Sequence, residues 1–201
     1  MGRAAIIAAR RGMLKGAEAE AMKALWRRLD TPGHDSALLR RSESGWLLTG
    51  FAVFRHASGP SGLAYEVEAD GAWATRRGRI SGFLGATEVD HDIRRDPDGW
   101  RLNGVRTAGL GHLLDLDLSF TPATNLLQLR RATPEIGQAV SLPAAWFDLD
   151  AGALSELPQS YARIAERSYR YAAPSVGYEG VLEMSADGFV ARYPGLWRRE
   201  A

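Results

Sequence analysis

The sequence contains no cysteine, and this absence excludes several kinds of chemistry at once. Without thiols the protein can form no disulfide framework, hold no zinc ion through thiolates and use no cysteine nucleophile. Disulfides belong to oxidising compartments, so their absence agrees with a cytoplasmic location, which we therefore expect.

Long hydrophobic runs and an excess of one charge are also missing. The apolar run at residues 4–9 is far shorter than the roughly 20 residues of a membrane-spanning helix, so no membrane span is expected. The 25 Lys and Arg residues nearly balance the 24 Asp and Glu residues, whereas nucleic-acid binding needs a clustered basic excess. We therefore expect no nucleic-acid partner, and 201 residues fit one domain of ordinary size.

Recognised catalytic and metal-binding patterns are scarce as well. The four histidines are scattered, and none belongs to an H-x-H, H-E-x-x-H or G-x-S-x-G sequence. Around His91, neighbouring side chains of a strand point to opposite faces, so only Asp90 and Asp92 could share a cation. The run from Gly109 to Gly111 lacks the lysine and the helix of a phosphate-binding loop. We expect no metal site, no cofactor and, on balance, no enzymatic activity.

What the chain does contain is a rhythm of short strand-like runs separated by glycine turns. Asp-Gly pairs at positions 70, 98 and 187 each precede an aromatic residue, and such pairs favour hairpins because glycine tolerates a positive φ. The patterns predict strands at residues 34–39, 46–56, 62–68, 73–79, 83–94, 100–105, 115–119, 126–131, 161–171, 178–184 and 189–193.

Many strands and little helix indicate a mainly β fold, either a single-domain antiparallel β-roll or a strongly curved, barrel-like sheet. Residues 144–157, bounded by Pro143 and Pro158, are predicted as a short helix or a pair of turns. Residues 1–23 are rich in alanine but repeat no apolar face. They are predicted to form a poorly ordered or loosely docked extension, and residues 24–201 the β-roll domain.

The densest mixture of polar and apolar residues lies between Asp115 and Arg131. Asp115 and Asp117 alternate with leucines, as in a strand with one acidic face, and the turn-forming residues 119–125 follow. If residues 126–131 return as a second strand, a hairpin brings an aspartate within reach of Arg130 or Arg131. Adjacent strand residues point to opposite faces, so only one of the two arginines can face inward.

This segment and several later motifs resemble a bacterial glycolipid-binding family, known as a domain of unknown function. The resemblance rests on D-x-D, T-P-x-T-N and R-R in this run, then Q-x-Y ending at Tyr161, Y-x-Y ending at Tyr171, and Y-P-x-L-W ending at Trp197. It covers the chain from about Trp26 to the end. The sequence departs from the family wording at Leu126 and Gln128, where threonine and proline are expected.

The resemblance implies a spiral β-roll that holds a glycolipid or another amphipathic molecule within or at the mouth of a curved sheet. Polar and aromatic side chains would hold the head group, and an apolar interior would accept an acyl chain. The candidate ligand-binding residues are Asp115, Asp117, Asn125, Arg130, Arg131, Tyr161, Tyr171 and Trp197.

Three alternatives remain open at this point. The acid–base pair can instead be a buried salt bridge that fixes the scaffold. Asp115 or Asp117 can serve a hydrolase-like enzyme acting on a sugar or lipid ester. The chain can also be a structural module that forms a homodimer through an exposed edge strand such as residues 161–171.

Overall fold

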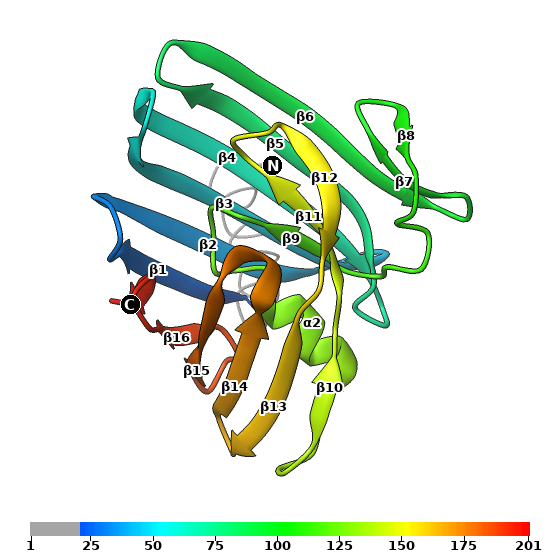
Figure 1. Ribbon diagram of the computed structural model, residues 1–201, viewed down its shortest axis with the longest axis vertical. Coiled ribbons are helices and arrows are strands. Elements are labelled where there is room, and N and C mark those ends of the chain that lie inside the picture. Colours follow the sequence, from blue (N-terminus) through cyan, green and yellow to red (C-terminus); the bar gives the residue numbers. More distant parts are fainter. Residues whose placement is uncertain (1–20) are drawn as a thin grey trace, which may run out of the picture.

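The structure, a computed structural model, describes residues 21–201 and consists of two β-sheets around one α-helix (Figure 1). The large sheet is antiparallel and has 14 strands in the order β10-β13-β14-β15-β16-β17-β1-β2-β3-β4-β5-β6-β7-β8. The strands that it takes from the N-terminal half of the chain are β1 (Met22–Arg28), β2 (Gly33–Ser42), β3 (Gly45–His56), β4 (Gly59–Asp70), β5 (Thr75–Leu84), β6 (Thr87–Asp96), β7 (Gly99–Leu102) and β8 (Val105–Thr107).

The C-terminal half supplies the remaining strands of the large sheet, which are β10 (Ala139–Ser141), β13 (Ser160–Ala165), β14 (Ser168–Ala173), β15 (Tyr178–Met184), β16 (Val190–Tyr193) and β17 (Trp197–Arg199). A three-stranded sheet contains β9 (Leu116–Leu118), β11 (Ala144–Asp148) and β12 (Ala153–Leu157). Helix α2 spans Asn125–Ala132, and a short 3₁₀ helix spans Pro174–Val176.

Residue alternation explains why the long strands form one wall. From Leu48 to Phe54 in β3 and from Ser61 to Ala69 in β4 every second residue is buried, as expected for strands with one face against a core and one face toward water. Strand β17 pairs with β1 and so joins the two halves of the chain, while β10 and β8 remain at opposite edges. The expected mainly β, antiparallel, strongly curved fold is therefore confirmed, as a roll that does not close into a barrel.

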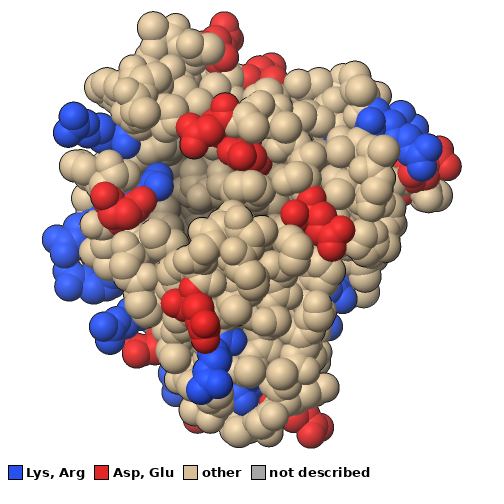
Figure 2. All heavy atoms as spheres, viewed as in Figure 1, with Lys and Arg blue, Asp and Glu red and all other residues tan. Residues whose placement is uncertain are grey.

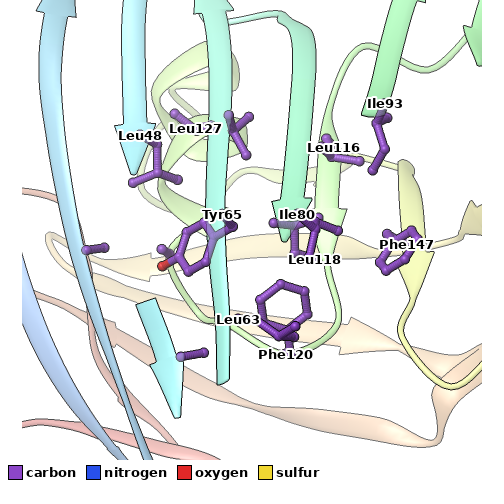
Figure 3. Packing of buried hydrophobic residues seen from close by; sticks show 14 of the residues in the cluster. Leu48, Leu63, Tyr65, Ile80, Ile93, Leu116, Leu118, Phe120, Leu127 and Phe147 are labelled. Atoms are coloured by element: carbon purple, nitrogen blue, oxygen red, sulfur yellow. The ribbon is translucent and has the colours of Figure 1, made fainter. Parts of the chain in front are cut away.

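The concave side of the large sheet is filled by the small sheet and α2 (Figure 1). Figure 3 shows Leu63 and Ile80 of the large sheet beside Leu118 and Phe120, which come from β9 and the residues after it. The two layers approach so closely that a side chain at Gly78 of β5 would clash with Leu116 of β9. The interior is thus a packed core.

The predicted hairpin between residues 115–119 and 126–131 is wrong. Residues 126–131 belong to helix α2, whose residues Asn125 to Leu129 are all buried. Strand β9 pairs in parallel with β11 instead. A short leucine-rich segment fits a strand or a buried helix equally well, and here the space under the curved sheet favours the helix.

Three other expectations are corrected by the strand pairing. Residues 144–157 form the β11–β12 hairpin and contain no helix. Residues 161–171 form two strands, β13 and β14, and β13 lies between β10 and β14, so it is no edge strand. Turns also divide the predicted strands 83–94 and 100–105, at Gly85 and at Gly104, where φ is positive.

The predicted extension over residues 1–23 lies almost wholly outside the described residues, and β1 begins at Met22. Within residues 21–201 no helix is both long and apolar enough to cross a membrane. Figure 2 shows acidic and basic side chains scattered over one face of the molecule, with most of that face uncharged.

Candidate functional site

An ion pair between Asp115 and Arg131 connects the segment before β9 to helix α2. Arg131 Nε donates to Asp115 Oδ1 at 3.0 Å, and Arg131 Nη2 donates to Asp115 Oδ2 at 2.6 Å. The aspartate side chain is 1% exposed and the arginine side chain 22%. Such a bidentate pair fixes the relative orientation of the two side chains. The hydrogen bonds to Asp115 raise the pKa of Arg131 above its ordinary value. The expected pairing of an acid and an arginine is therefore present, but between the segment before β9 and a helix.

A second network of buried polar side chains centres on Gln128 of α2. Gln128 Nε2 donates to Asp117 Oδ2 at 3.3 Å, while Gln128 Oε1 accepts from Gln159 Nε2 at 2.8 Å and from the Tyr161 hydroxyl at 3.1 Å. Asn125 Nδ2 donates to the same tyrosine hydroxyl at 2.8 Å.

The network extends one strand further through Gln159. Its Oε1 accepts a 2.7 Å hydrogen bond from the hydroxyl of Tyr171 on β14. Through these contacts the helix, β9 and the strands β13 and β14 are tied together. Gln128 stands at one of the two positions where the sequence departs from the family wording, and its amide is the shared partner.

Burial dominates the electrostatics of this network. It raises the pKa of Asp117 to about 7, while the hydrogen bond from Gln128 opposes the shift and the nearby charge of Asp115 adds to it. Burial also raises the pKa of Tyr161 well above its ordinary value. Near neutral pH the tyrosine is therefore a neutral hydrogen-bonding group, and Asp117 is close to its point of half-protonation.

A third buried acid, Asp35 of β2, escaped sequence analysis. The hydroxyls of Tyr65 and Thr121 both donate to its carboxylate, and burial raises its pKa to about 7. A signal was present, because Asp35 occupies the inward register of β2 together with Ala37 and Leu39. Thr121 belongs to the T-P-x-T-N motif, so this motif links the small sheet to the large one.

A groove lies at the end of α2, between the β13–β14 turn and the β15–β16 turn. Its volume is about 340 Å³. The apolar part of the lining consists of Leu126, Leu129, Tyr169, Met184 and Ala186, and the charged part of Arg130, Arg163, Glu166 and Arg167.

The arginines of the groove differ in how their N–H groups are used. Arg163 donates to three backbone carbonyls, those of Pro134, Ala165 and Glu166. Arg130 donates to the backbone oxygen of Asp187 at 2.8 Å and is exposed. Within residues 21–201 no carboxylate lies within 4.0 Å of Arg130, which leaves its guanidinium with N–H groups for a ligand.

The eight residues expected to bind a ligand therefore separate into three groups. The first group forms the buried networks, although one member, Arg131, is partly exposed to solvent. It consists of Asp115, Asp117, Asn125, Arg131, Tyr161 and Tyr171. Trp197 is 5% exposed and packs in the main core. Arg130 alone among the eight lines the groove.

The arrangement of the carboxylates offers little to a reaction. Asp115 is bound by Arg131 and Asp117 by Gln128, and neither lines the groove beside α2. Asp90 and Asp92, considered above for a cation, contact arginines instead, with Arg77 Nη2 at 2.8 Å from Asp92. Among the described residues no group of three or more His, Asp or Glu side chains could hold a metal ion.

The described residues define a class of protein, the open antiparallel β-roll around one helix. Buried carboxylates connect its elements, and a groove lies at the end of the helix. The family model described as "Putative glycolipid-binding" matches residues 23–199, and the chain belongs to that family. The sequence resemblance is thereby confirmed.

One solved structure extends this comparison. It is the crystal structure of a DUF1089 family protein from Pseudomonas aeruginosa, with a TM-score of 0.66 and 24% sequence identity. The alignment covers 90% of this chain and 92% of that chain, and it shows that the two proteins share a fold. No curated protein sequence matches this chain significantly.

Proposed function

We propose that the protein binds an amphipathic molecule, a glycolipid as the family description suggests, in the groove beside the end of α2. The observation that carries the proposal is the composition of this groove, which combines an apolar floor with charged side chains on its rim. A volume of about 340 Å³ accommodates part of an acyl chain together with one end of a head group.

The floor and the rim suit different parts of such a ligand. Leu129 and Met184 offer apolar surface to a hydrocarbon chain. Arg130 can donate to hydroxyl or other oxygen atoms of the head group, and Glu166 can accept from hydroxyls. Arg163 is held by carbonyls and shapes the rim.

The buried networks support this site from behind. The Asp115–Arg131 pair and the contacts of Gln128 fix the position of α2, whose residues Leu129 and Arg130 line the groove. In this proposal the buried acids position the binding site and catalyse no reaction. The glycolipid itself and the cytoplasmic location remain predictions.

The test is retention of lipid by the pure protein. The full chain is incubated with a bacterial lipid extract, and native mass spectrometry is expected to show one lipid per chain. Binding to Ala186→Trp, which fills the exposed mouth of the groove, is expected to weaken at least about tenfold.

Ala151→Trp is the matched control, because Ala151 is also exposed but lies in the β11–β12 turn. Equal binding by Ala186→Trp and the control would move the site away from the groove. Recovery of empty protein from every extract would overturn the proposal itself.

A further inference from the structure

The convex face of the large sheet carries an apolar strip across three adjacent strands. Phe51 and Val53 of β3 are 67% and 64% exposed, and Phe83 of β5 is 49% exposed. The register places Val53, Gly62 and Phe83 in one row and Phe51 beside Ala64 in the next. Contiguous exposed apolar surface often marks an interaction site, whereas single exposed apolar residues are normal.

A shallow depression lies within the strip. Gly62 lies between Val53 and Phe83, and the Phe83 ring packs over it, since a Cβ at this position would come within 3.2 Å of the ring. Together with Gly82 it leaves a shallow depression of about 320 Å³, which Phe51, Val53 and Phe83 also line. The face therefore offers both projecting side chains and a recess.

The two sides of the strip carry opposite charges in the same rows. On β1, Arg27 lies in the row of Val53, and on β6, Glu88 lies in that row too. Arg27 makes only a loose, half-exposed contact with Glu200 at 3.7 Å. Within the part of the chain that the structure describes, Glu88 has no basic side chain within 4.0 Å.

A twofold axis that lies just outside this face, parallel to the strands and midway between β3 and β4, makes the face complementary to itself. It keeps each row in place and exchanges β3 with β4 and β1 with β6. Val53 then lies over the second copy's Gly62 and against the Phe83 ring that covers it, and Phe51 lies over the second copy's Ala64. Arg27 lies over the second copy's Glu88, and the symmetry repeats every contact.

We propose that this convex face binds a second copy of the chain and forms a twofold dimer of stacked sheets. Aligned packing of two sheet faces is a common arrangement in β proteins. The dimer leaves the groove beside α2 open, because its residues lie outside the apolar strip. The contact ends at the row of Arg40, which would face the second copy's Arg77 with a like charge.

A lipid surface is the other class of partner that exposed phenylalanines suit. The charges favour the second copy, because an anionic lipid surface would attract Arg27 but repel Glu88, whereas a second copy pairs both charges. The outcome of the experiment separates these two partners.

The first measurement is the mass of the full chain in solution. Sedimentation equilibrium at concentrations up to about 200 µM is expected to show a reversible approach to twice 21.9 kDa. Phe51→Asp is expected to weaken the association at least about a hundredfold, because it buries a charge at the centre of the contact. Val105→Asp, at a 71% exposed apolar residue of β8, is the control and should leave the mass unchanged.

The second measurement tests the pairing of charges. Arg27→Glu and Glu88→Arg are each expected to weaken the dimer about tenfold, and the double variant to recover most of the loss. A monomer at every concentration overturns the proposal. So does a dimer in which the double variant is no tighter than either single variant, or a monomer that binds phosphatidylglycerol vesicles through Phe51.

Discussion

Arg130 and Arg131 are neighbours in the chain, yet they lie in different surroundings. Consecutive residues of a helix point about 100° apart, so α2 turns Arg131 toward the buried Asp115 and leaves Arg130 on the surface. The sequence predicted that only one of the two arginines faces inward. The helix determines that it is Arg131.

The two arginines give a matched pair of variants at the residue scale. Arg131→Ala leaves the carboxylate of Asp115 buried without its partner and is expected to lower the free energy of unfolding by about 3 kcal/mol. Arg130→Ala removes an exposed side chain and should cost less than about 1 kcal/mol. Urea denaturation measures both, and equal losses would contradict the assignment of Arg131 as the structural member.

The pKa of Asp117 leads to a pH dependence whose sign is opposite to that of a salt-bridged acid. Burial raises the pKa of the folded state from 3.8 to about 7. Between these values the folded protein holds a proton that the unfolded chain has released, so the free energy of unfolding falls as pH rises from about 4 to about 7 and then levels off.

Asp117→Asn removes this titration. The loss of stability between pH 5 and pH 8 is therefore expected to be smaller in the variant than in the unmodified protein, by up to roughly 2.5 kcal/mol. Asp98→Asn, at an exposed turn position, serves as the control. A variant that loses as much stability as the unmodified protein would show that Asp117 titrates normally.

At the scale of elements, α2 depends on its surroundings more than on its own sequence. It has eight residues, no side-chain cap at Thr124 and no acidic residue in its first turn. Isolated helices of this length are unstable in water, so its stability comes from tertiary contacts. Five buried residues and the network of Gln128 supply those contacts.

Gln128→Leu tests this dependence. Leucine has a similar size but cannot bond to Asp117, Gln159 or Tyr161, so buried polar groups lose their partner, and the expected loss of unfolding free energy is about 2 to 4 kcal/mol. Gln138→Leu, at an exposed glutamine, should cost less than about 1 kcal/mol. Thermal unfolding followed by circular dichroism measures both variants.

For the whole molecule, the pairing of β17 with β1 joins the C-terminal strands to the N-terminal ones. Trp197 of β17 is 5% exposed and packs with residues of the main core. The expected role of this residue as a ligand contact therefore competes with a structural role that its burial supports.

Trp197→Ala is expected to lower the free energy of unfolding by about 3 to 5 kcal/mol, because it leaves a cavity where the two halves of the sheet meet. The affinity of the folded fraction for lipid should be unchanged, since Trp197 does not line the groove. Denaturant titration and native mass spectrometry give the two quantities. Weaker binding without a loss of stability would return Trp197 to the ligand site.

The sequence by itself determined the fold class and most of the hairpins. Alternation of apolar and polar residues and the Asp-Gly turns are local features, so they can be recognised in the sequence of each strand and turn. The pairing of an acid near Asp115 with one arginine of the R-R motif was also predictable, because a buried charge requires a partner.

Only the tertiary structure decided that residues 126–131 are helical, that Gln128 connects the buried network and that the interior is filled. A short leucine-rich segment does not specify its own secondary structure. Whether a polar residue is a ligand contact or a core contact depends on which elements cover it. These outcomes follow from packing against strands that lie far away in the chain. Local pattern contains no information about that space.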